Sequence, residues 1–330
     1  MRYVFGAGGT AGHVFMALGI AKHLGGERLL ITDSRGAQHL KPSLTEFDKI
    51  IVIPGPTGIR NTFRSISLIW KDMRGVYIGC GASTSLLVGI VGFLRKMKMY
   101  LYQGDQIMGR ANKVMQYLVA NSFVSTKNLH MRKRKVVGVV SRYENVDTKM
   151  YLGDKFKILI MGSSTGSRFF DTLMYKIFQN LDCKSEISVV QQSKSADLDL
   201  KYTELGLEFV LKEFIDIYYE MPKCHLVFCR AGWSTVADIL TFRRAAILIP
   251  WSGALDNHQF YNAKAVGADS RWVFQETDSP EEIAKFISYL IKDTYSKNEN
   301  EVNHGEIYIR SRYADGPFIG GGERIARSIC

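Results

Sequence analysis

The stretch RYVFGAGGTAGHVFMALGIA, residues 2–21, joins two apolar runs through a loop that is rich in glycine. The first run has the composition of a short strand, and the second, from about Val14, has that of a helix. In open α/β sheets, ligands bind beyond the carboxyl ends of strands, where the first amides of a helix attract anions. The stretch therefore predicts a phosphate-binding strand, loop and helix.

The glycine spacing does not fit two common phosphate loops. Gly6, Gly8, Gly9 and Gly12 form GxGGxxG instead of the Rossmann GxGxxG, and no GK[ST] follows as in a Walker A loop. A dehydrogenase stays a weaker alternative: Asp33 stands about 20 residues beyond the loop, where a ribose acid would be, but hydride-transfer residues are missing. A tight turn that needs glycine only for steric reasons also stays open.

Short apolar strands alternate with helical stretches along the chain, which is typical of βα units around a parallel sheet. One series contains RYVFGAG, RLLITDS, KIIVIPG, GVYIGCG and MYLYQG, and a second contains FKILIMGSS, EISVVQQ, LEFVLKEF, HLVFCRAG and AAILIPW. We therefore expect an α/β protein with two Rossmann-like, doubly wound parallel sheets. The polar segment VVSRYENVDTKMYLGDK, residues 139–155, is the expected linker.

The 330 residues carry a formal net charge of +11, which favours nucleic acid, an anionic membrane or phosphorylated substrates as partners. No nucleic-acid-binding module is recognisable, so we expect no nucleic acid partner. No signal-peptide pattern precedes the first strand, and the longest apolar stretch, Leu86 to Leu94, is too short to span a bilayer. We expect a cytosolic protein whose membrane contact is peripheral.

One histidine and one loop rich in hydroxyl side chains stand at the starts of predicted helices and suggest chemistry there. His13 stands where a helix begins, and a helix N-terminus favours the neutral imidazole, which accepts a proton; a lone histidine is more often structural. MGSSTGSR, residues 161–168, offers hydroxyls, amides and Arg168 to a phosphate after the strand FKILI.

Two later loops suggest recognition of a sugar nucleotide. In FCRAGWSTVADIL, residues 228–240, Asp238 lies one turn into a helix, where its carboxylate suits the two hydroxyls of a ribose. An ordinary first-turn acid would look the same. WSGALDNHQFYNA, residues 251–263, gathers polar side chains for sugar hydroxyls, although a solvated loop would look similar.

These loops, in this order, resemble the MurG-type N-acetylglucosaminyltransferases of peptidoglycan synthesis. GGTAGH is similar to the family's GGTGGH, GSSTGSR to GGSxGAR, CRAGWSTVAD to CRSGAxTxxE with Asp238 for Glu, and DNHQFYNA to DxHQxxNA. The resemblance implies a GT-B fold, in which two Rossmann-like domains face each other across a cleft. It implies an N-terminal acceptor and membrane-facing domain (1–142), a C-terminal UDP-GlcNAc domain (143–310) and a tail helix (311–330) that packs back on the first domain.

The resemblance also implies an inverting hexosyltransferase that serves cell wall biogenesis, cell shape and cell division. It would transfer GlcNAc from UDP-GlcNAc to the C4 hydroxyl of lipid I, undecaprenyl-pyrophosphoryl-MurNAc-pentapeptide, to give lipid II. Such a reaction needs a base for the hydroxyl and stabilisation of the departing UDP, which amides supply without a metal or cofactor. Two alternatives stay open: a GT-B transferase with another acceptor, and a nucleotide-sugar-binding protein that has lost turnover.

The site residues follow from the same resemblance. His13 matches the loop histidine usually proposed as the base. The family's His-Glu-Gln-Asn is here Tyr102, Gln103, Gly104 and Asp105, so the neutral Gln103 cannot act as a base and Asp105 is the second candidate. The expected UDP-GlcNAc contacts are Thr10, Ala11, Gly12, Asp105, Arg142, Ser164, Ile215, Trp233, Ser234, Thr235, Val236, Ala237, Asp238, His258 and Gln259.

An anionic lipid acceptor would require a basic and apolar surface on the first domain. NTFRSISLIWKDMRG, residues 61–75, interleaves Phe63 and Trp70 with arginine and lysine, and LRKMKMYLY, residues 94–102, adds three more cations. Such segments suit the anionic inner leaflet of the cytoplasmic membrane. For each segment taken singly, a core helix with a solvated basic face is an equally good interpretation.

Overall fold

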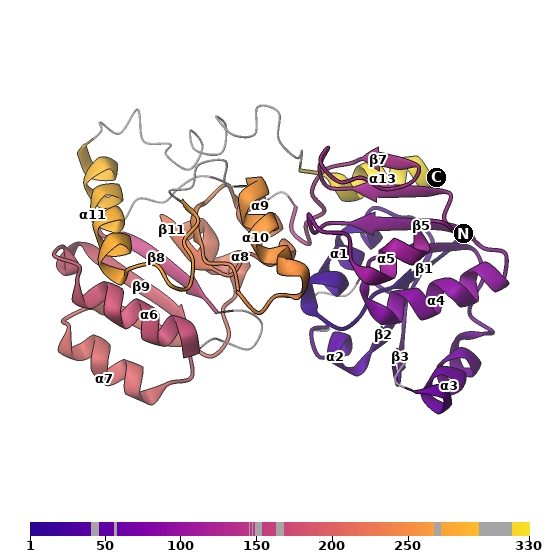
Figure 1. Cartoon of the computed structure of the whole chain (residues 1–330), viewed down its shortest axis with the longest axis horizontal. Helices are drawn as coiled ribbons and strands as arrows, with labels where there is room; N and C mark the ends of the chain where they lie inside the picture. Colours follow the sequence, from indigo (N-terminus) through magenta and orange to yellow (C-terminus); the bar gives the residue numbers. More distant parts are fainter. Residues whose placement is uncertain are drawn as a thin grey trace. The chain divides into compact units, whose positions relative to one another are not determined.

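The computed structural model describes residues 1–40, 46–55, 58–144, 146, 148, 154–162, 168–266, 272–296 and 319–330. The chain divides into two compact units (Figure 1). Unit 1 comprises Met1–Glu144 and Gly316–Cys330, and unit 2 comprises Asn145–Asp315. Both chain ends therefore belong to the same unit.

Unit 1 is built on a seven-stranded parallel sheet in the order β3-β2-β1-β4-β5-β6-β7. Its elements are β1 (Arg2–Gly6), α1 (Ala11–Ala21), β2 (Glu27–Asp33), α2 (Ser34–Ala37), β3 (Lys49–Ile53), α3 (Ile59–Ile69), β4 (Val76–Gly79), α4 (Ala82–Leu94), β5 (Lys98–Gln103), α5 (Arg110–Met115), β6 (Asn121–Val124), β7 (Arg134–Val136) and α13 (Gly321–Ile329). The inner strands β1, β2, β4, β5 and β6 are mostly buried, as expected for a parallel sheet covered by helices, whereas the edge strands β3 and β7 are largely exposed.

The strand order of unit 1 reverses between β1 and β4. The chain leaves β1 toward β2 on one side and leaves β4 toward β5 on the other. Because such crossovers are right-handed, α1 and α4 cover opposite faces of the sheet. The loops after β1 and β4 are therefore the place where an open α/β sheet binds a ligand.

Unit 2 is built on a five-stranded parallel sheet in the order β10-β9-β8-β11-β12. Its elements are β8 (Phe156–Met161), α6 (Arg168–Gln179), η2 (Lys184–Glu186), β9 (Ile187–Gln192), α7 (Ala196–Glu204), β10 (Glu208–Lys212), α8 (Ile217–Glu220), η3 (Met221–Lys223), β11 (Leu226–Cys229), α9 (Trp233–Phe242), β12 (Ala245–Leu248), η4 (Leu255–Asn257), α10 (His258–Val266) and α11 (Pro280–Ser296). Its order reverses between β8 and β11, so the loops after these two strands lie at the second switch point.

The prediction of two parallel α/β sheets is confirmed, with one difference at the expected linker. Val139 and Val140 are buried, and the Tyr102 hydroxyl donates to the Gly138 carbonyl (3.2 Å) and accepts from the Val140 amide (3.1 Å). The first residues of the expected linker therefore belong to the core of unit 1, because apolar packing and this buried tyrosine hold them.

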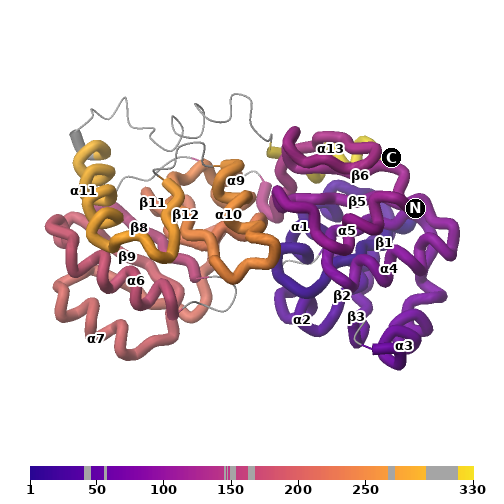
Figure 2. Tube along the Cα trace, in the orientation of Figure 1, coloured from indigo at the N-terminus to yellow at the C-terminus, as the bar shows by residue number. Residues whose placement is uncertain are grey.

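The C-terminal helix α13 lies beside β7 and packs on α1 (Figures 1 and 2). Its first amide, at Gly321, donates to the Val139 carbonyl at 2.9 Å, and Lys135 of β7 donates to Ser328 at 2.8 Å. A side chain at Gly322 would place its Cβ 2.1 Å from the Gly19 carbonyl oxygen of α1. The two helices thus approach closely because a glycine stands at their contact.

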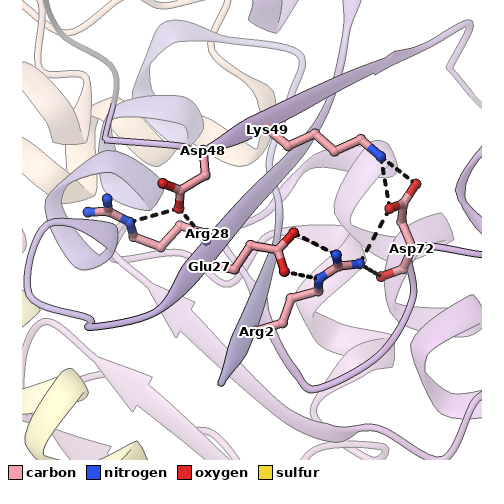
Figure 3. A network of polar contacts seen from close by, with 6 residues as sticks. All are labelled: Arg2, Glu27, Arg28, Asp48, Lys49 and Asp72. Atoms are coloured by element: carbon pink, nitrogen blue, oxygen red, sulfur yellow. Dashed lines mark hydrogen bonds and ion pairs between the residues drawn. The ribbon is translucent and has the colours of Figure 1, made fainter.

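A charged network joins the opposite, N-terminal ends of the strands in unit 1 (Figure 3). The Arg2 guanidinium contacts the Glu27 carboxylate at 2.6 Å and the Asp72 carboxylate at 3.3 Å, and Lys49 contacts Asp72 at 2.9 Å. These side chains tie together the starts of β1, β2 and β3. The network belongs to the edge of the sheet away from the ligand loops.

Candidate active site

The loop after β1 presents His13 in one defined orientation. His13 Nδ1 lies 3.0 Å from the Gly8 carbonyl oxygen and 3.1 Å from Thr10 Oγ1. A carbonyl oxygen only accepts, so the contact with Gly8 is a hydrogen bond only when Nδ1 carries the proton. In the neutral imidazole the lone pair is then on Nε2, which is the form a general base needs.

The loop after β4 lies against the other side of the same ring. A Cβ on Gly81 would lie 2.6 Å from His13 Cδ2 and 2.8 Å from Nε2, and Gly81 has a φ of +109°. Both the close approach and the backbone angle require glycine here. The sequence analysis missed Gly81, for which a glycine after an apolar strand is the only local signal.

Asp33, which would bind the ribose in the dehydrogenase alternative, forms its hydrogen bonds within the protein. Its carboxylate is 4% exposed and accepts hydrogen bonds from the Gly9 amide (3.0 Å), the Gly36 amide (2.9 Å) and the Thr84 hydroxyl (2.9 Å). Burial alone would raise the pKa of Asp33, but these hydrogen bonds hold it below its ordinary value. A carboxylate used in this way is not available to a ribose.

The loop after β5 is organised by the side chain of Gln103. Its amide nitrogen donates to the carbonyl oxygens of Asp105 (2.8 Å) and Ile107 (3.1 Å), and its oxygen accepts from Asn112 at 2.8 Å. Gln103 is 4% exposed, and the Asp105 side chain is half-buried. Gln103 therefore shapes the backbone on which Asp105, the second candidate base, is carried.

In unit 2, helix α9 begins directly at the switch point of the sheet. Its N-cap is Gly232, which has no side chain to cap the first amides of the helix. The first turn of α9, which the structure describes in full, contains no acidic residue. Ser234 and Thr235 are half-buried there. Uncapped amides and a positive helix end form an anion site. Ser164, expected to contact the same ligand, lies outside the described residues.

The remaining α9 residues of the expected donor site are covered. Trp233, Val236, Ala237 and Asp238 are each at most 2% exposed. The indole nitrogen of Trp233 is buried and has no hydrogen-bond partner among the described residues. Burial, and next the nearby charge of Asp238, raise the pKa of the Cys229 thiol, which places this carboxylate beside β11.

His258 and Gln259 hold the loop that follows β12. His258 Nδ1 lies 2.8 Å from the Leu255 carbonyl, and Gln259 accepts from the Trp251 amide at 3.0 Å. Asn262, one turn on, is buried and donates to the Ala231 carbonyl at 3.0 Å, so it joins α10 to the loop before α9. Ile215 is 5% exposed and lies between β10 and α8.

Arg230 connects several of these loops and was not predicted as a site residue. Its guanidinium lies 2.6 Å from Glu276, donates to the Ile249 carbonyl at 3.1 Å and stacks 4.2 Å from the Phe169 ring. It therefore joins the start of α6 to the loops after β11 and β12. Its position in the CRAG segment was the sequence signal that could have identified Arg230 as a site residue.

The expected residues that the structure describes divide between the two units. One group is in unit 1, after β1 and β5, and contains Thr10, Ala11, Gly12, His13 and Asp105. The other is in unit 2 and contains Ile215, Trp233, Ser234, Thr235, Val236, Ala237, Asp238, His258 and Gln259. Arg142, expected beside the donor residues, belongs to unit 1, where it stacks 3.8 Å from the Phe15 ring of α1.

Comparisons with known proteins identify relatives of this chain. Residues 157–308 match the glycosyltransferase family 28 C-terminal domain. A UDP-N-acetylglucosamine--N-acetylmuramyl-(pentapeptide) pyrophosphoryl-undecaprenol N-acetylglucosamine transferase of Rhizobium etli (strain CIAT 652) is 28% identical over 87% of this chain and 86% of its own. A transferase of the same name from Wolbachia sp. subsp. Brugia malayi (strain TRS) is 27% identical over 94% of this chain and 96% of its own.

A solved structure shows the same fold over the whole chain. The crystal structure of Acinetobacter baumannii MurG superimposes with a TM-score of 0.77 at 18% identity, covering 100% of this chain and 99% of that one. Two parallel α/β sheets that superimpose on those of MurG show the GT-B fold, and the family 28 match identifies the chain as a glycosyltransferase. Within that class the chain matches the MurG transferases of glycosyltransferase family 28 over most of its length.

No helix in the described ranges is both long enough and apolar enough to cross a membrane. In the same ranges, no group of three or more His, Cys, Asp or Glu side chains is arranged to hold a metal ion.

Proposed function

We propose that this protein transfers GlcNAc from UDP-GlcNAc to the C4 hydroxyl of lipid I, with inversion, and so makes lipid II for peptidoglycan synthesis. Relatives that bear this activity in their names match over 87% to 94% of the chain. The observation that carries the proposal is the orientation of His13, whose Nδ1 lies 3.0 Å from the Gly8 carbonyl oxygen. A proton on Nδ1 would be donated to this carbonyl and would leave Nε2 as the basic nitrogen.

In the proposed reaction, His13 Nε2 takes the proton of the acceptor hydroxyl. The hydroxyl oxygen bonds to the anomeric carbon, the bond from that carbon to UDP breaks, and the bonding electrons leave with UDP. The first amides of α9 and the hydroxyls of Ser234 and Thr235 would stabilise the negative charge that develops on the diphosphate. Asp105 is the alternative base.

We propose that unit 1 docks on an anionic membrane through α3 and the end of α4. Ile59, Phe63 and Leu68 of α3 are 78%, 69% and 48% exposed, and Phe93 and Leu94 of α4 are 53% and 60% exposed. Helices α3 and α4, which carry these residues, pack against each other. Apolar residues beside lysine and arginine suit the inner leaflet, on the cytoplasmic face.

A transfer assay tests the function. The protein is incubated with radiolabelled UDP-GlcNAc and a short-chain lipid I analogue, and UDP binding is titrated in parallel. Labelled lipid product together with UDP binding supports the proposal. UDP binding with transfer only to other lipid or sugar acceptors would show a different acceptor, and UDP binding without any transfer would show a binding protein.

A further inference from the structure

One peptide group in the loop after β1 carries hydrogen bonds on both of its sides. The amide of Gly9 donates to Asp33 at 3.0 and 3.1 Å, and the carbonyl of Gly8 lies 3.0 Å from His13 Nδ1. The Gly8 carbonyl and the Gly9 amide belong to the same peptide bond. A trans peptide is planar, so its N–H and C=O point in opposite directions.

This geometry connects the orientation of the histidine to Asp33. While the Gly9 amide is held on the Asp33 carboxylate, the Gly8 carbonyl is aimed at His13 and cannot turn away. The loop has no room to shift, because a Cβ on Gly8 would lie 2.7 Å from Thr84 Oγ1 and 3.0 Å from Asp33 Oδ2. The Gly8 carbonyl also accepts from the Thr10 amide at 2.8 Å, which fixes its direction further.

The charge of Asp33 acts in the same direction as the geometry. A carboxylate that accepts from a peptide N–H polarises the peptide, which makes the carbonyl oxygen at its other end a stronger acceptor. A stronger acceptor at Gly8 favours the proton on Nδ1 and stabilises the positive charge that His13 gains when Nε2 is protonated. Arg35, 3.8 Å from Asp33 and largely exposed, is the cation near this carboxylate.

We propose that Asp33 is a positioning residue that acts through the Gly8–Gly9 peptide to hold His13 in its Nδ1–H tautomer and to support its protonation at Nε2. Thr84 shares this role, because its hydroxyl fixes the second carboxylate oxygen of Asp33. The arrangement does the work of an aspartate–histidine pair with one peptide group between the two side chains. The catalytic part of the inference rests on the proposed function, whereas the tautomer does not.

The first test is the tautomer, measured on the full chain. Nitrogen-15 NMR of histidine-labelled protein distinguishes Nδ1–H from Nε2–H imidazole, and His13→Gln identifies the His13 signals. We expect Nδ1–H in the wild type and a marked gain of Nε2–H in Asp33→Asn. Nε2–H in the wild type, or an unchanged tautomer in a folded Asp33→Asn, would overturn the proposal.

The second test is kinetic and uses a control of the same chemistry. Asp33→Asn is expected to lower kcat by roughly 10- to 100-fold while leaving KM for UDP-GlcNAc within about twofold. Asp48→Asn removes a carboxylate that also accepts a backbone amide, that of Arg28 at 2.7 Å, at the other edge of the sheet (Figure 3). It is expected to change stability but not kcat. Equal kcat in both variants would contradict the proposal.

Thr84 variants decide the matter if Asp33→Asn does not fold. Thr84→Val removes the hydroxyl that donates to Asp33, and Thr84→Ser keeps it. We expect Nε2–H to rise in Thr84→Val and to return to the wild-type level in Thr84→Ser. Identical His13 spectra in these two variants would argue against the relay, and absence of transfer in the wild type would refute the proposed function without touching the NMR result.

Discussion

At the level of single residues, base chemistry and donor binding belong to different side chains in the proposed reaction. His13→Ala removes the proposed base, so we expect transfer to fall by about 10²- to 10⁴-fold with UDP binding largely intact. Asp238→Ala should instead weaken UDP binding. Stopped-flow or steady-state kinetics combined with calorimetric titration of UDP checks both, and full activity in His13→Ala would move the base to Asp105.

The family resemblance suggests that a glutamate fits at position 103, whereas the contacts of Gln103 predict that a glutamate there destabilises this protein. The family has a glutamate at this position, but here the Gln103 amide donates to two carbonyl oxygens. Gln103→Glu would place a buried carboxylate against these oxygens and is expected to cost about 1–3 kcal/mol of unfolding free energy.

The matched control for Gln103 is Gln116→Glu. Gln116, after α5, is only half-buried, and its side-chain hydrogen bonds to the backbone of Lys113 and Arg132 are exposed, so water can solvate a carboxylate there. Chemical denaturation of both variants provides the comparison. A Gln103→Glu protein as stable as the wild type, or more active, would show that the loop accommodates the family's acid and that the amide contacts are dispensable.

The buried imidazole of His225 is expected to make the stability of the protein depend on pH. It is 4% exposed, and its Nδ1 accepts from the Lys157 amide at 2.9 Å. Burial, followed by the charges of Arg244 and Lys157, lowers the pKa of His225 from 6.5 to about 4. Between these pH values the unfolded chain binds the proton first, so stability is complete above about pH 6.5 and falls by up to about 3 kcal/mol toward pH 4.

The variant His225→Asn keeps an acceptor for the Lys157 amide and removes the titrating group. Its unfolding free energy is expected to depend less on pH between 6.5 and 4, by about 1.4 kcal/mol per pH unit at most. Urea denaturation at several pH values measures the slope. A slope equal to that of the wild type would assign the acid sensitivity to other groups.

At the element scale, the strand, loop and helix units were predictable because their signals are local. The apolar strand and glycines that precede α1, and the CRAG turn before α9, are contiguous in sequence. Helix α1 nevertheless begins at Ala11, earlier than the expected Val14, because the small residues after Thr10 already adopt helical backbone angles.

The contacts that complete the site were not predictable from local pattern. Asp33 reaches the Gly9 amide, and Gly81 approaches the His13 ring, only after β1, β2 and β4 pair into one sheet. For the same reason the sequence motif around Arg142 did not reveal that this side chain packs on α1. Short-range pattern gives elements and candidate residues, and tertiary pairing decides which of them meet.

The exposed apolar residues of helix α3 lead to a prediction about membrane binding. Phe63→Ser removes an apolar side chain that is 69% exposed, so stability should not change. If this side chain enters the leaflet, binding to anionic vesicles should weaken by about 10- to 100-fold. Leu200→Ser, an equally exposed apolar position on α7 of unit 2 (66%), is the control and should bind normally in vesicle flotation. Equal loss in both variants would speak against docking through α3.

At the scale of the whole molecule, the positive charge is concentrated in one part of the sequence. Residues 49–143 hold 16 of the 43 Lys and Arg residues but only 2 of the 32 Asp and Glu residues. This segment alone therefore carries +14, and the rest of the chain carries −3. The excess belongs to unit 1, which also bears the exposed apolar residues of α3 and α4.

The charge distribution predicts that membrane binding depends on salt. Raising the ionic strength from about 0.1 to 1 M shortens the screening length from about 10 to 3 Å. Binding to vesicles that contain anionic lipid should therefore fall steeply, and binding to neutral vesicles should be weak at either salt concentration. Salt-independent binding to both vesicle types would assign the attachment to apolar contacts alone.

The glycosidic bond in the product shows whether GlcNAc is transferred with inversion to one hydroxyl of lipid I. Carbon-13-labelled UDP-GlcNAc is mixed with the protein and a short-chain lipid I analogue, with a chelator present, and the products are identified by NMR. We expect a β-linked GlcNAc on C4 of the muramoyl residue. Free GlcNAc, an α-linked product or unchanged donor would contradict it.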